Sequence, residues 1–510
     1  MSNPPPDLAV LARRGCDEDE DEIVSTLIDA VDGYAADHID AQRFDRAHTI
    51  PRELLTELAE MGLFSLSIPE AWGGAGLSLH AVCEVLSALA AHDRSIATTV
   101  GLHLGLGTRG LVAFGSSELQ ERILPSLATG ERIAAFAATE PGAGSDLKRI
   151  STRVREEGDG LRVDGTKIFV TNGGFADVFT LLTTSPGLGG ARRGQSLILL
   201  EREDEGLNIG AEEQKLGLRA SSTVTVNLDG VCVPRSRIIG EPGLGTRLAG
   251  HVLSWGRTAM AAGCVGSSAA ALDQTIQHAL TRKQFGKPLA QLPVVRAQIA
   301  AATAELYAAR ALVRWTTCSD ETELVRRSTS AKVFCSRAAW SCSDRALQLH
   351  GGAGFIEETG IALILRDTRV TRIFEGANDV LLGHAGSLTL LDPPNRTPLS
   401  EAAPADPLAA KADGITQIAV EMAAEIKHTL GMKALARPPI LHQLGEVVVL
   451  ADAARAAAMR ALAEGTEHGR STASLFLHHV QQRIELHRAP LPQTELIRSI
   501  CTPLYERGST

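Results

Sequence analysis

The sequence predicts an α+β fold that is mainly helical, because the period of its apolar residues changes twice along the chain. Helical spacing dominates from about residue 21 to 131, strand-like spacing with Asp-Gly pairs follows from 132 to 240, and helical spacing returns from 241. At 510 residues and 44% hydrophobic content, the chain exceeds one simple core. We therefore expect an N-terminal helical domain, a central β domain, a C-terminal four-helix bundle and an additional C-terminal helical appendage.

The first segment of the chain is acidic. Residues 17–22 supply six negative charges to a net charge of −10. Such a block is most often solvated, so residues 1–20 are expected to form a disordered acidic tail. A docking tail for a basic partner is the alternative. The opening MSNPPP lacks a basic start followed by an apolar stretch, which argues against a transit peptide and favours a cytoplasmic protein.

Composition argues against several other classes of protein. No stretch approaches the ~18 uninterrupted apolar residues of a membrane span, and no feature points to nucleic-acid binding. The eight cysteines are scattered without C-x-x-C pairs. We therefore expect neither a disulfide framework nor a metal site.

The N-terminal helical domain is predicted over 21–131, where Pro51 stands at a helix start and leucines follow at helical spacing. The β domain is predicted over 132–240. Its strand-like stretches are 161–163, 178–182, 196–200 and 223–228, and Asp-Gly pairs at 159–160, 164–165 and 229–230 are expected to form hairpin turns.

The second half of the chain is expected to be helical. Alanine-rich stretches at 258–280, 296–313 and 331–347 favour a bundle of long, closely packed helices over 241–391. Five prolines predict a linker over 392–414. Beyond it, apolar residues on single helical faces predict a helical extension over 415–510.

Two short runs have the clearest chemical meaning: TEPGAGSD at 139–146 and RIFEGAND at 372–379. In the first, Gly142 and Gly144 let main-chain N–H groups approach a ligand because they have no Cβ. In the second, Glu375 follows two apolar residues, and an apolar setting raises the pKa of a carboxylate toward values useful to a general base. Taken singly, each run could instead be a turn, the second with an acidic helix start.

Three further runs accompany them in a fixed order: KIFVTNG at 167–173, RKQFG at 282–286 and QLHGGAGF at 348–355. From roughly residue 50 to 390 this series resembles the acyl-CoA dehydrogenase family. HVLSWGR at 251–257 and ASST at 220–223 are similar to its very-long-chain branch. The resemblance implies a FAD flavoprotein that desaturates an acyl thioester of CoA or of a carrier protein and passes electrons to an electron-transfer flavoprotein.

The resemblance also implies a catalytic base. In the family the base is the glutamate of the Phe-Glu-Gly motif, here Glu375, whose backbone N–H helps to bind the thioester oxygen. Some branches place the base one residue before an arginine on a long helix, and that position is Gly256 before Arg257 here. Gly256 cannot act as a base. A flavin must accept the hydride, since no side chain can.

Cofactor and substrate positions follow from the same resemblance. Within one chain, the flavin is expected against Phe136, Ala138, Thr139, Ser145, Phe169, Thr171, Ala377 and Asp379. The neighbouring subunit is expected to add Arg282, Gln284, Phe285, Gln348, Gly351 and Gly352, which implies a homodimer. The substrate is expected against Ser145, Ser254, Arg257, Phe374, Glu375 and Gly376. Phe169 stands where many relatives have tryptophan, and Ala377 where they have a flavin-contacting threonine.

Other interpretations stay open for the sequence alone. A flavin oxidase or monooxygenase on the same scaffold would pass electrons to oxygen. A non-catalytic assembly protein is the other alternative, although Glu375 argues against a purely structural role. Gly101, Gly105 and Gly107 could leave room for a long acyl chain or could allow a tight helix crossing.

Overall fold

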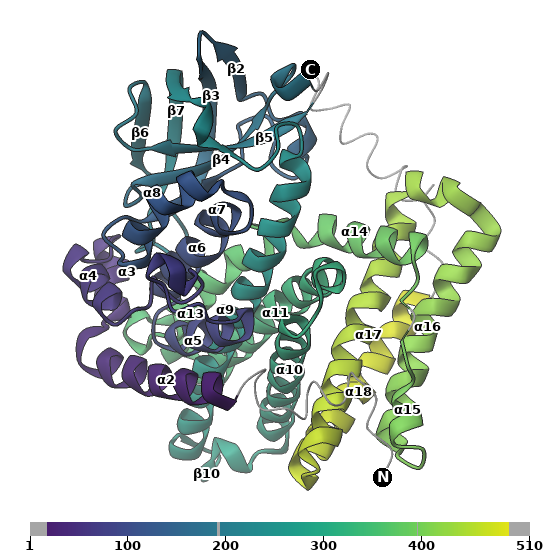
Figure 1. Ribbon diagram of the computed structural model, residues 1–510. Helices are drawn as coiled ribbons and strands as arrows, with labels where there is room; N and C mark the ends of the chain where they lie inside the picture. Colours follow the sequence, from purple (N-terminus) through teal and green to yellow (C-terminus); the bar gives the residue numbers. More distant parts are fainter. Residues whose placement is uncertain (1–17, 191–193, 395, 489–510) are drawn as a thin grey trace, which may run out of the picture.

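The computed structural model describes residues 18–190, 194–394 and 396–488. A group of helices precedes the sheet in the described chain and lies below it in Figure 1. They are α2 (Glu18–His38), α3 (Ala41–Ala47), α4 (Arg52–Glu60), α5 (Leu79–His92), α6 (Arg94–Leu102), the π-helical turn η2 (His103–Gly107), α7 (Arg109–Phe114) and α8 (Ser117–Ala128). Ser78, Asp93 and Ser116 cap α5, α6 and α8, because each side chain accepts a backbone N–H of the first turn.

The expectation of a disordered tail over 1–20 is wrong for its last three residues. Helix α2 begins at Glu18, and the Glu20 carboxylate accepts the backbone N–H of Ser78 at 2.6 Å and its hydroxyl at 2.7 Å. Negative charge is favourable in the first turn of a helix, which explains why this acidic run is helical. Residues 1–17 lie outside the described chain.

The central part is an eight-stranded sheet. Its strands are β1 (Ala134–Ala137), β2 (Arg153–Glu157), β3 (Gly160–Thr171), β4 (Val178–Thr184), β5 (Gln195–Glu201), β6 (Leu207–Glu212), β7 (Thr223–Pro234) and β8 (Ile238–Ile239). The order is β6-β7-β3-β2-β4-β5-β8, with β1 parallel to β4. One hydrophobic core lies between this sheet and α8, and a second lies within the β domain.

Two of the three expected hairpin turns are wrong. The pair at 159–160 does lie between the antiparallel strands β2 and β3. The pairs at 164–165 and 229–230 instead lie inside β3 and β7, where the register shifts between Val163 and Gly165. They form an irregularity in two long paired strands, and Gly165 and Gly230 supply the positive φ that it requires.

Long helices follow the sheet. They are α9 (Gly245–Thr281), α10 (Pro293–Thr317), α11 (Glu321–His350) and α14 (Asn378–Leu391), with the hairpin β9 (Lys283–Gln284) and β10 (Lys287–Pro288) and the short helices α12 (Gly352–Phe355) and α13 (Ile361–Arg369) between them. Small residues allow close packing here: a Cβ at Gly266 of α9 would overlap the Ser87 carbonyl of α5. The predicted fold class and order of domains are confirmed.

The C-terminal extension contains α15 (Leu399–Ala402), α16 (Pro407–Leu430), α17 (Pro438–Glu464) and α18 (Glu467–Arg488). The linker predicted over 392–414 is therefore wrong in part. Pro407 is the first residue of α16, where its fixed φ suits a helix start, and Asp406 caps the helix by accepting the N–H of Leu408 at 2.9 Å. Figure 1 shows these helices, in light green and yellow, beside α10 and α14. Residues 489–510 of the predicted extension lie outside the described chain.

Helix α17 crosses α14 at two glycines. A Cβ at Gly386 of α14 would overlap the Leu441 carbonyl of α17, and a Cβ at Gly445 of α17 would overlap the Leu382 carbonyl of α14. The backbones can approach this closely only because both residues lack side chains. The extension is therefore packed directly on the helix that follows Glu375.

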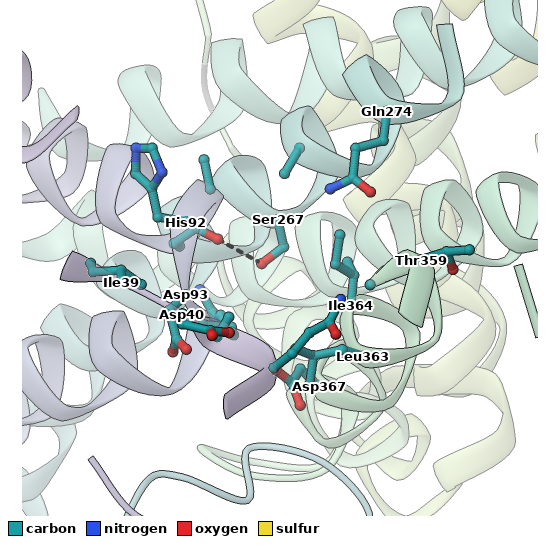
Figure 2. Close-up of a pocket in the computed structure, with 17 residues that line it drawn as sticks. Ile39, Asp40, His92, Asp93, Ser267, Gln274, Thr359, Leu363, Ile364 and Asp367 are labelled. Atoms are coloured by element: carbon teal, nitrogen blue, oxygen red, sulfur yellow. Dashed lines mark hydrogen bonds between the residues drawn. The ribbon is translucent and has the colours of Figure 1, made fainter. Parts of the chain in front are cut away.

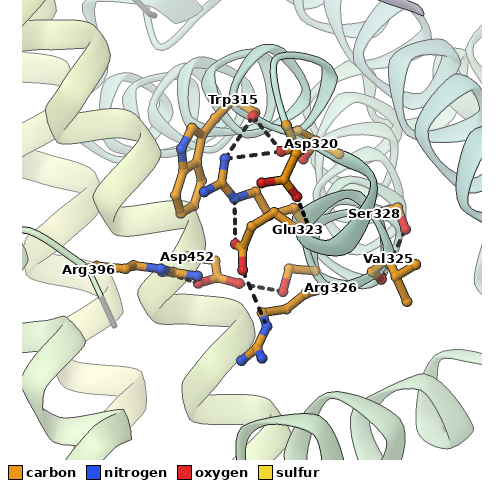
Figure 3. A network of polar contacts seen from close by, with 12 residues as sticks. Trp315, Asp320, Glu323, Val325, Arg326, Ser328, Arg396 and Asp452 are labelled. Carbon is orange, nitrogen blue, oxygen red and sulfur yellow. Dashed lines mark hydrogen bonds and ion pairs between the residues drawn. The ribbon is translucent and has the colours of Figure 1, made fainter. Parts of the chain in front are cut away.

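A buried polar network joins the extension to the bundle (Figure 3). The Arg396 guanidinium pairs with Asp452 of α17 at 2.6 Å, and the other carboxylate oxygen of Asp452 accepts the Ser330 hydroxyl of α11 at 2.6 Å. The guanidinium groups of Arg327 and Arg396 lie 4.1 and 4.7 Å from the centre of the Trp315 ring. Within the described residues, no helix is both long and apolar enough to span a membrane.

Candidate functional site

Glu375 lies in a tight turn between η8 (Val370–Arg372) and α14. Its φ is +54°, and that of Gly376 is +103°. A non-glycine residue in the left-handed region is strained, and such strain persists where the surrounding contacts determine the conformation. The turn is therefore held in place by its neighbours.

Two side chains hold this turn by its main chain. Arg257 of α9 donates from Nε to the Glu375 carbonyl at 3.1 Å. Lys332 of α11 donates from Nζ to the Gly376 carbonyl and to Oδ1 of Asn378, both at 2.8 Å. The Asn378 amide in turn donates to the Ser336 hydroxyl at 3.0 Å. Two bundle helices thus fix the residues on either side of the Glu375 side chain.

Glu375 is half-buried as a residue, and one oxygen of its carboxyl group is buried without a hydrogen-bond partner. Its Oε2 has no hydrogen bond within the described chain. Burial raises the pKa of Glu375 to about 7, and the nearby positive charges of Lys332, Arg257 and Arg94 act in the opposite direction. A carboxyl group that titrates near neutrality can accept a proton from a weak carbon acid.

Gly256, the other candidate position for a base, faces Glu375. A Cβ at Gly256 would lie 3.1 Å from Oε2 of Glu375 and would overlap Cδ2 of Leu106. The chain therefore has room for one acidic side chain at this point. The two positions that the sequence suggested for a base share one space, and Glu375 fills it.

The loop at 139–146 adjoins strand β3. Glu140 and Lys167 form a fully buried ion pair at 2.8 Å, and Glu140 also accepts the backbone N–H groups of Ser151 and Thr152 at 2.5 and 2.9 Å. The ion pair and these hydrogen bonds hold the pKa of Glu140 at about 2, although burial opposes them. The Ile168 N–H donates to the Thr139 carbonyl at 2.9 Å. The loop is thus fixed at its base.

Phe169 points away from the core of the β domain. The register of β3 and β7 shifts between Lys167 and Val170, Phe169 has a φ of +55°, and its side chain is 61% exposed. Bulges of this kind redirect side chains. Phe136 and Ala138 are buried in and beside β1, Thr139 and Thr171 are half-buried, and Ser145 is exposed. The predicted flavin positions of one chain therefore lie around the fixed loop.

A separate group of predicted residues lies at the far end of the bundle. The rings of His278 and His350 stack at 4.2 Å, which brings the C-terminal ends of α9 and α11 together. The predicted residues that follow these two helix ends are exposed, and Phe285 is 89% exposed. Arg282, Gln284 and Phe285 follow α9, and Gly351 and Gly352 follow α11. Gln348 lies in the last turn of α11. Thr281 follows Arg257 by 24 residues of α9, which at 1.5 Å per residue is about 36 Å.

Several other predicted residues lie near Glu375 or beside its turn. Ser254 is buried, and its hydroxyl donates to the Gly250 carbonyl within α9 at 3.0 Å. Phe374 and Ala377 are half-buried. Asp379 is exposed, and one carboxylate oxygen lies 3.7 Å from Nε2 of His442 in the extension.

The glycines of η2, and Gly101 at the end of α6, favour tight packing over an open cavity. A Cβ at Gly107 would lie 2.7 Å from that of Ala134, and one at Gly101 would lie 3.2 Å from Cδ1 of Leu86. A Cβ at Gly105 would lie 3.7 Å from the Cα of Gly256, in ordinary van der Waals contact. Short π-helical segments are frequent at functional sites, and this one adjoins the glycine that faces Glu375.

A pocket lined by polar groups lies elsewhere in the described chain. A pocket of about 350 Å³ is lined by residues of α5, α6, α9 and α13 and of the 39–42 segment (Figure 2). Burial raises the pKa values of its Asp93 and Asp367 to about 7, but both accept backbone N–H groups, of Ile96 and Leu218. None of the predicted catalytic or cofactor residues lines it. No metal-binding group of three or more His, Cys, Asp or Glu occurs in the described chain.

Sequence reasoning missed Lys332, Glu140 and Lys167 as functional neighbours. The sequence does contain an indication of a role for Lys332, because it is the only charged residue between Arg327 and Arg337 of α11. Charged residues are rarely buried without a polar contact to compensate. A lone lysine among small residues of a predicted bundle helix therefore suggests a buried polar contact.

Comparisons with known proteins match this architecture. Family models of the acyl-CoA dehydrogenase N-terminal, middle and C-terminal domains match residues 19–131, 135–231 and 243–387. The human mitochondrial very long-chain specific acyl-CoA dehydrogenase is 32% identical over 71% of this chain and 57% of its own, so the chain spans little more than half the length of that relative.

Two bacterial proteins extend the comparison. The probable acyl-CoA dehydrogenase fadE25 of Mycobacterium bovis is 33% identical over 71% of this chain and 93% of its own. A crystal structure of an acyl-CoA dehydrogenase from Bacillus anthracis, complexed with FAD, has a TM-score of 0.84 and 25% identity, and covers 99% of this chain and 95% of that chain. The chain belongs to the acyl-CoA dehydrogenase family.

Proposed function

We propose that this protein is a FAD-dependent acyl-CoA dehydrogenase in which Glu375 is the catalytic base. The main support is the carboxyl group of Glu375, which has a buried, unpartnered oxygen and a pKa raised to about 7. An ordinary buried carboxylate is paired or hydrogen-bonded at both oxygens. One that is left free and close to neutrality fits proton removal from the α-carbon of an acyl thioester.

The described residues fit a flavin. Phe169 is an exposed aromatic ring held in a strained conformation next to a loop whose Gly142 has open space where a Cβ would be. Phe136, Ala138, Thr139, Ser145, Phe169, Thr171, Ala377 and Asp379 would hold the flavin of their own chain. FAD, when bound, would supply the hydride acceptor that no side chain provides. The relative from Bacillus anthracis was solved with FAD.

The chain's own groups then divide the work of α,β-dehydrogenation. Ionised Glu375 takes the proton from the α-carbon, the electrons of that C–H bond form the double bond, and hydride leaves the β-carbon. The backbone N–H of Glu375 donates to the thioester oxygen, where negative charge develops. Arg257 and Lys332 keep that N–H and the carboxylate in place, because they hold the carbonyls of Glu375 and Gly376. Ser254, Phe374 and Ser145 would contact the substrate.

We propose that the cofactor is shared between two chains of a homodimer. Arg282 follows an α9 segment that ends about 36 Å from Arg257, so one chain cannot place both beside a single flavin ring and its diphosphate. An exposed arginine with exposed aromatic and glycine neighbours suits a diphosphate of a second chain. Electron transfer from the reduced flavin to an electron-transfer flavoprotein belongs to the same proposal.

Anaerobic mixing of the purified protein with a panel of saturated acyl-CoA thioesters tests this function. The flavin absorbance should bleach with at least one thioester, and Glu375→Gln should slow the bleaching by at least ~10²-fold while FAD stays bound. The control is Glu357→Gln, which changes an exposed glutamate elsewhere and should leave the rate unchanged. A folded, FAD-loaded protein that no thioester bleaches would contradict the proposal, and oxygen consumption during turnover would favour an oxidase instead.

A further inference from the structure

Lys332 is a buried cation without a carboxylate bonded to it. Lys332 is 0% exposed, and no carboxylate of the described chain forms an ion pair with its Nζ. Its acceptors are the Gly376 carbonyl and the Asn378 amide oxygen. Burying an ammonium group is costly, so a purely structural hydrogen bond at this point could be made at lower cost by a neutral donor.

The acceptors of Lys332 flank the catalytic carboxylate. Both belong to the turn directly after Glu375, and Ser336 of the same helix fixes the Asn378 side chain. Burial lowers the pKa of Lys332 to about 7, while the charge of Glu375 acts to raise it. The remaining charged or titratable groups around Lys332 are Arg257 and Cys264 of α9 and Arg372 of η8. Glu375 is the carboxylate among them.

We propose that Lys332 is a positioning residue of the dehydrogenation proposed above, holding the Glu375 turn in its left-handed conformation and supporting the ionised form of the carboxylate from a distance. This inference rests on the proposed function of Glu375. It assigns two roles to one side chain: the hydrogen bonds define where the carboxylate lies, and the charge influences whether it is ionised.

The indirect arrangement has a chemical reason. A cation bonded directly to Glu375 would lower its pKa by about 1–3 units and would make it a weaker base. Lys332 and Arg257 bond instead to carbonyl oxygens of the same turn. Their charges therefore act on the carboxylate without occupying the oxygen that takes the proton.

Two substitutions separate position from charge. Lys332→Met removes the hydrogen bonds and the charge, whereas Lys332→Gln removes the charge and keeps an N–H donor on a side chain that is one atom shorter. Ser330→Ala, two residues earlier in α11, is the control, since it removes a buried hydrogen bond to Asp452 of the extension and not to the Glu375 turn. The pH dependence of flavin reduction is measured anaerobically with the saturated acyl-CoA thioester that best bleaches the parent protein.

We expect the midpoint of that pH profile to rise by about one unit in both Lys332 variants, because the ionised base loses a nearby positive charge. The rate at neutral pH should fall at least about tenfold in Lys332→Met. Ser330→Ala should lower the melting temperature and leave the midpoint in place. If Lys332→Met does not fold, Lys332→Gln still decides the matter, because its midpoint is expected to move as well.

A second measurement needs no turnover. In protein freed of FAD, the loss of melting temperature caused by Lys332→Met is compared in the parent and in the Glu375→Gln background. The two losses should differ near pH 7, where Glu375 is partly ionised, and should become equal near pH 5, where it is protonated. An unchanged pH midpoint together with equal losses at both pH values would overturn the positioning role. Failure of every thioester to bleach the parent protein would instead overturn the function on which it rests.

Discussion

At the scale of residues, the positive charges around Glu375, the proposed base, do not bond to its carboxylate. Lys332, Arg257 and Arg94 all favour the ionised form of Glu375, yet two of them bond to main-chain oxygens of its turn and Arg94 donates to the Met260 carbonyl at 3.1 Å. Burial opposes them and is the larger effect. The outcome is a carboxyl group with a pKa of about 7, in the range where a base is both ionised and strong.

Removing the Glu375 carboxyl group should change how stability depends on pH. The pKa of Glu375 is about 7 in the folded protein and about 4.3 in an unfolded chain. Its stabilising contribution is therefore complete below about pH 4 and is lost as pH rises through about 7. The Glu375→Gln variant lacks this loss, so from about pH 5 to 8 it should gain roughly 1–3 kcal/mol relative to the parent. The melting temperatures of the two proteins are measured against pH. If they change in parallel over that range, this expectation is wrong.

The buried pair of Glu140 and Lys167 should be important for both stability and cofactor retention. Lys167→Met leaves the Glu140 carboxylate buried without its cation, which costs about 3–5 kcal/mol and loosens the loop at 139–146. The exposed pair of Asp146, at the end of the same loop, and Arg149 is the matched comparison, because breaking it should cost below about 1 kcal/mol. Denaturant unfolding and the ratio of FAD to protein measure the two effects. If breaking the exposed pair and breaking the buried pair lower stability and FAD content equally, burial of the Glu140–Lys167 pair is unimportant.

At the scale of elements, the helix that follows Glu375 is packed against the extension. Helix α14 begins three residues after Glu375 and crosses α17 at Gly386 and Gly445. Substitution of either glycine should therefore act at a distance on the Glu375 turn, since the helices must move apart to admit a Cβ.

Gly445→Ala tests this crossing. The added Cβ would overlap the Leu382 carbonyl, and forced separation of packed elements typically costs about 1–3 kcal/mol. Gly383→Ala on α14 is the control, because open space surrounds that position and alanine there should be neutral or should stabilise by about 0.5–1 kcal/mol. Thermal melting and the rate of flavin reduction report the difference. If both variants behave alike, the crossing is not as tight as described.

Most elements could be predicted because they depend on local sequence. The alanine-rich helices and the apolar strands have their own periods, and Pro51 stands directly before α4. The Asp-Gly pairs at 164–165 and 229–230 could not be assigned, since an Asp-Gly pair favours a turn equally in a hairpin and in an irregularity of paired strands. Only the partner strand decides between these two structures.

The candidate site shows the same division. The Phe-Glu-Gly motif identifies Glu375 from neighbouring residues, so it could be proposed from sequence. Lys332 lies 44 residues before Gly376, whose carbonyl it binds, and nothing in its own surroundings names that partner. The composition of the acidic run at 17–22 favours a solvated tail. The contact of Glu20 with Ser78 depends on residues far along the chain and forms only in the folded protein.

At the scale of the whole molecule, the extension completes the bundle. Helix α17 is almost wholly buried between α14, α10 and the other extension helices. Removing the chain from Thr397 onward should expose apolar faces of α10 and α14, with a lower melting temperature or aggregation, because these faces then meet water. A truncated protein with unchanged melting and assembly would show that the extension is independent of the core. Arg396→Ala, which removes the pair with Asp452 and the contact with the Trp315 ring, should cause a smaller loss in the same direction.

The length of α9 has a genetic consequence. If each flavin is served by Glu375 of one chain and Arg282 of the other, the two residues of any single chain belong to different active sites. Two inactive variants, Glu375→Gln and Arg282→Ala, would then repair one another when their subunits are mixed, because a mixed dimer contains one site with both native residues. Co-expression with two affinity tags and purification of the mixed species should yield about half of the parent activity, while each variant alone stays inactive. Mixed dimers without activity would mean that each chain completes its own site.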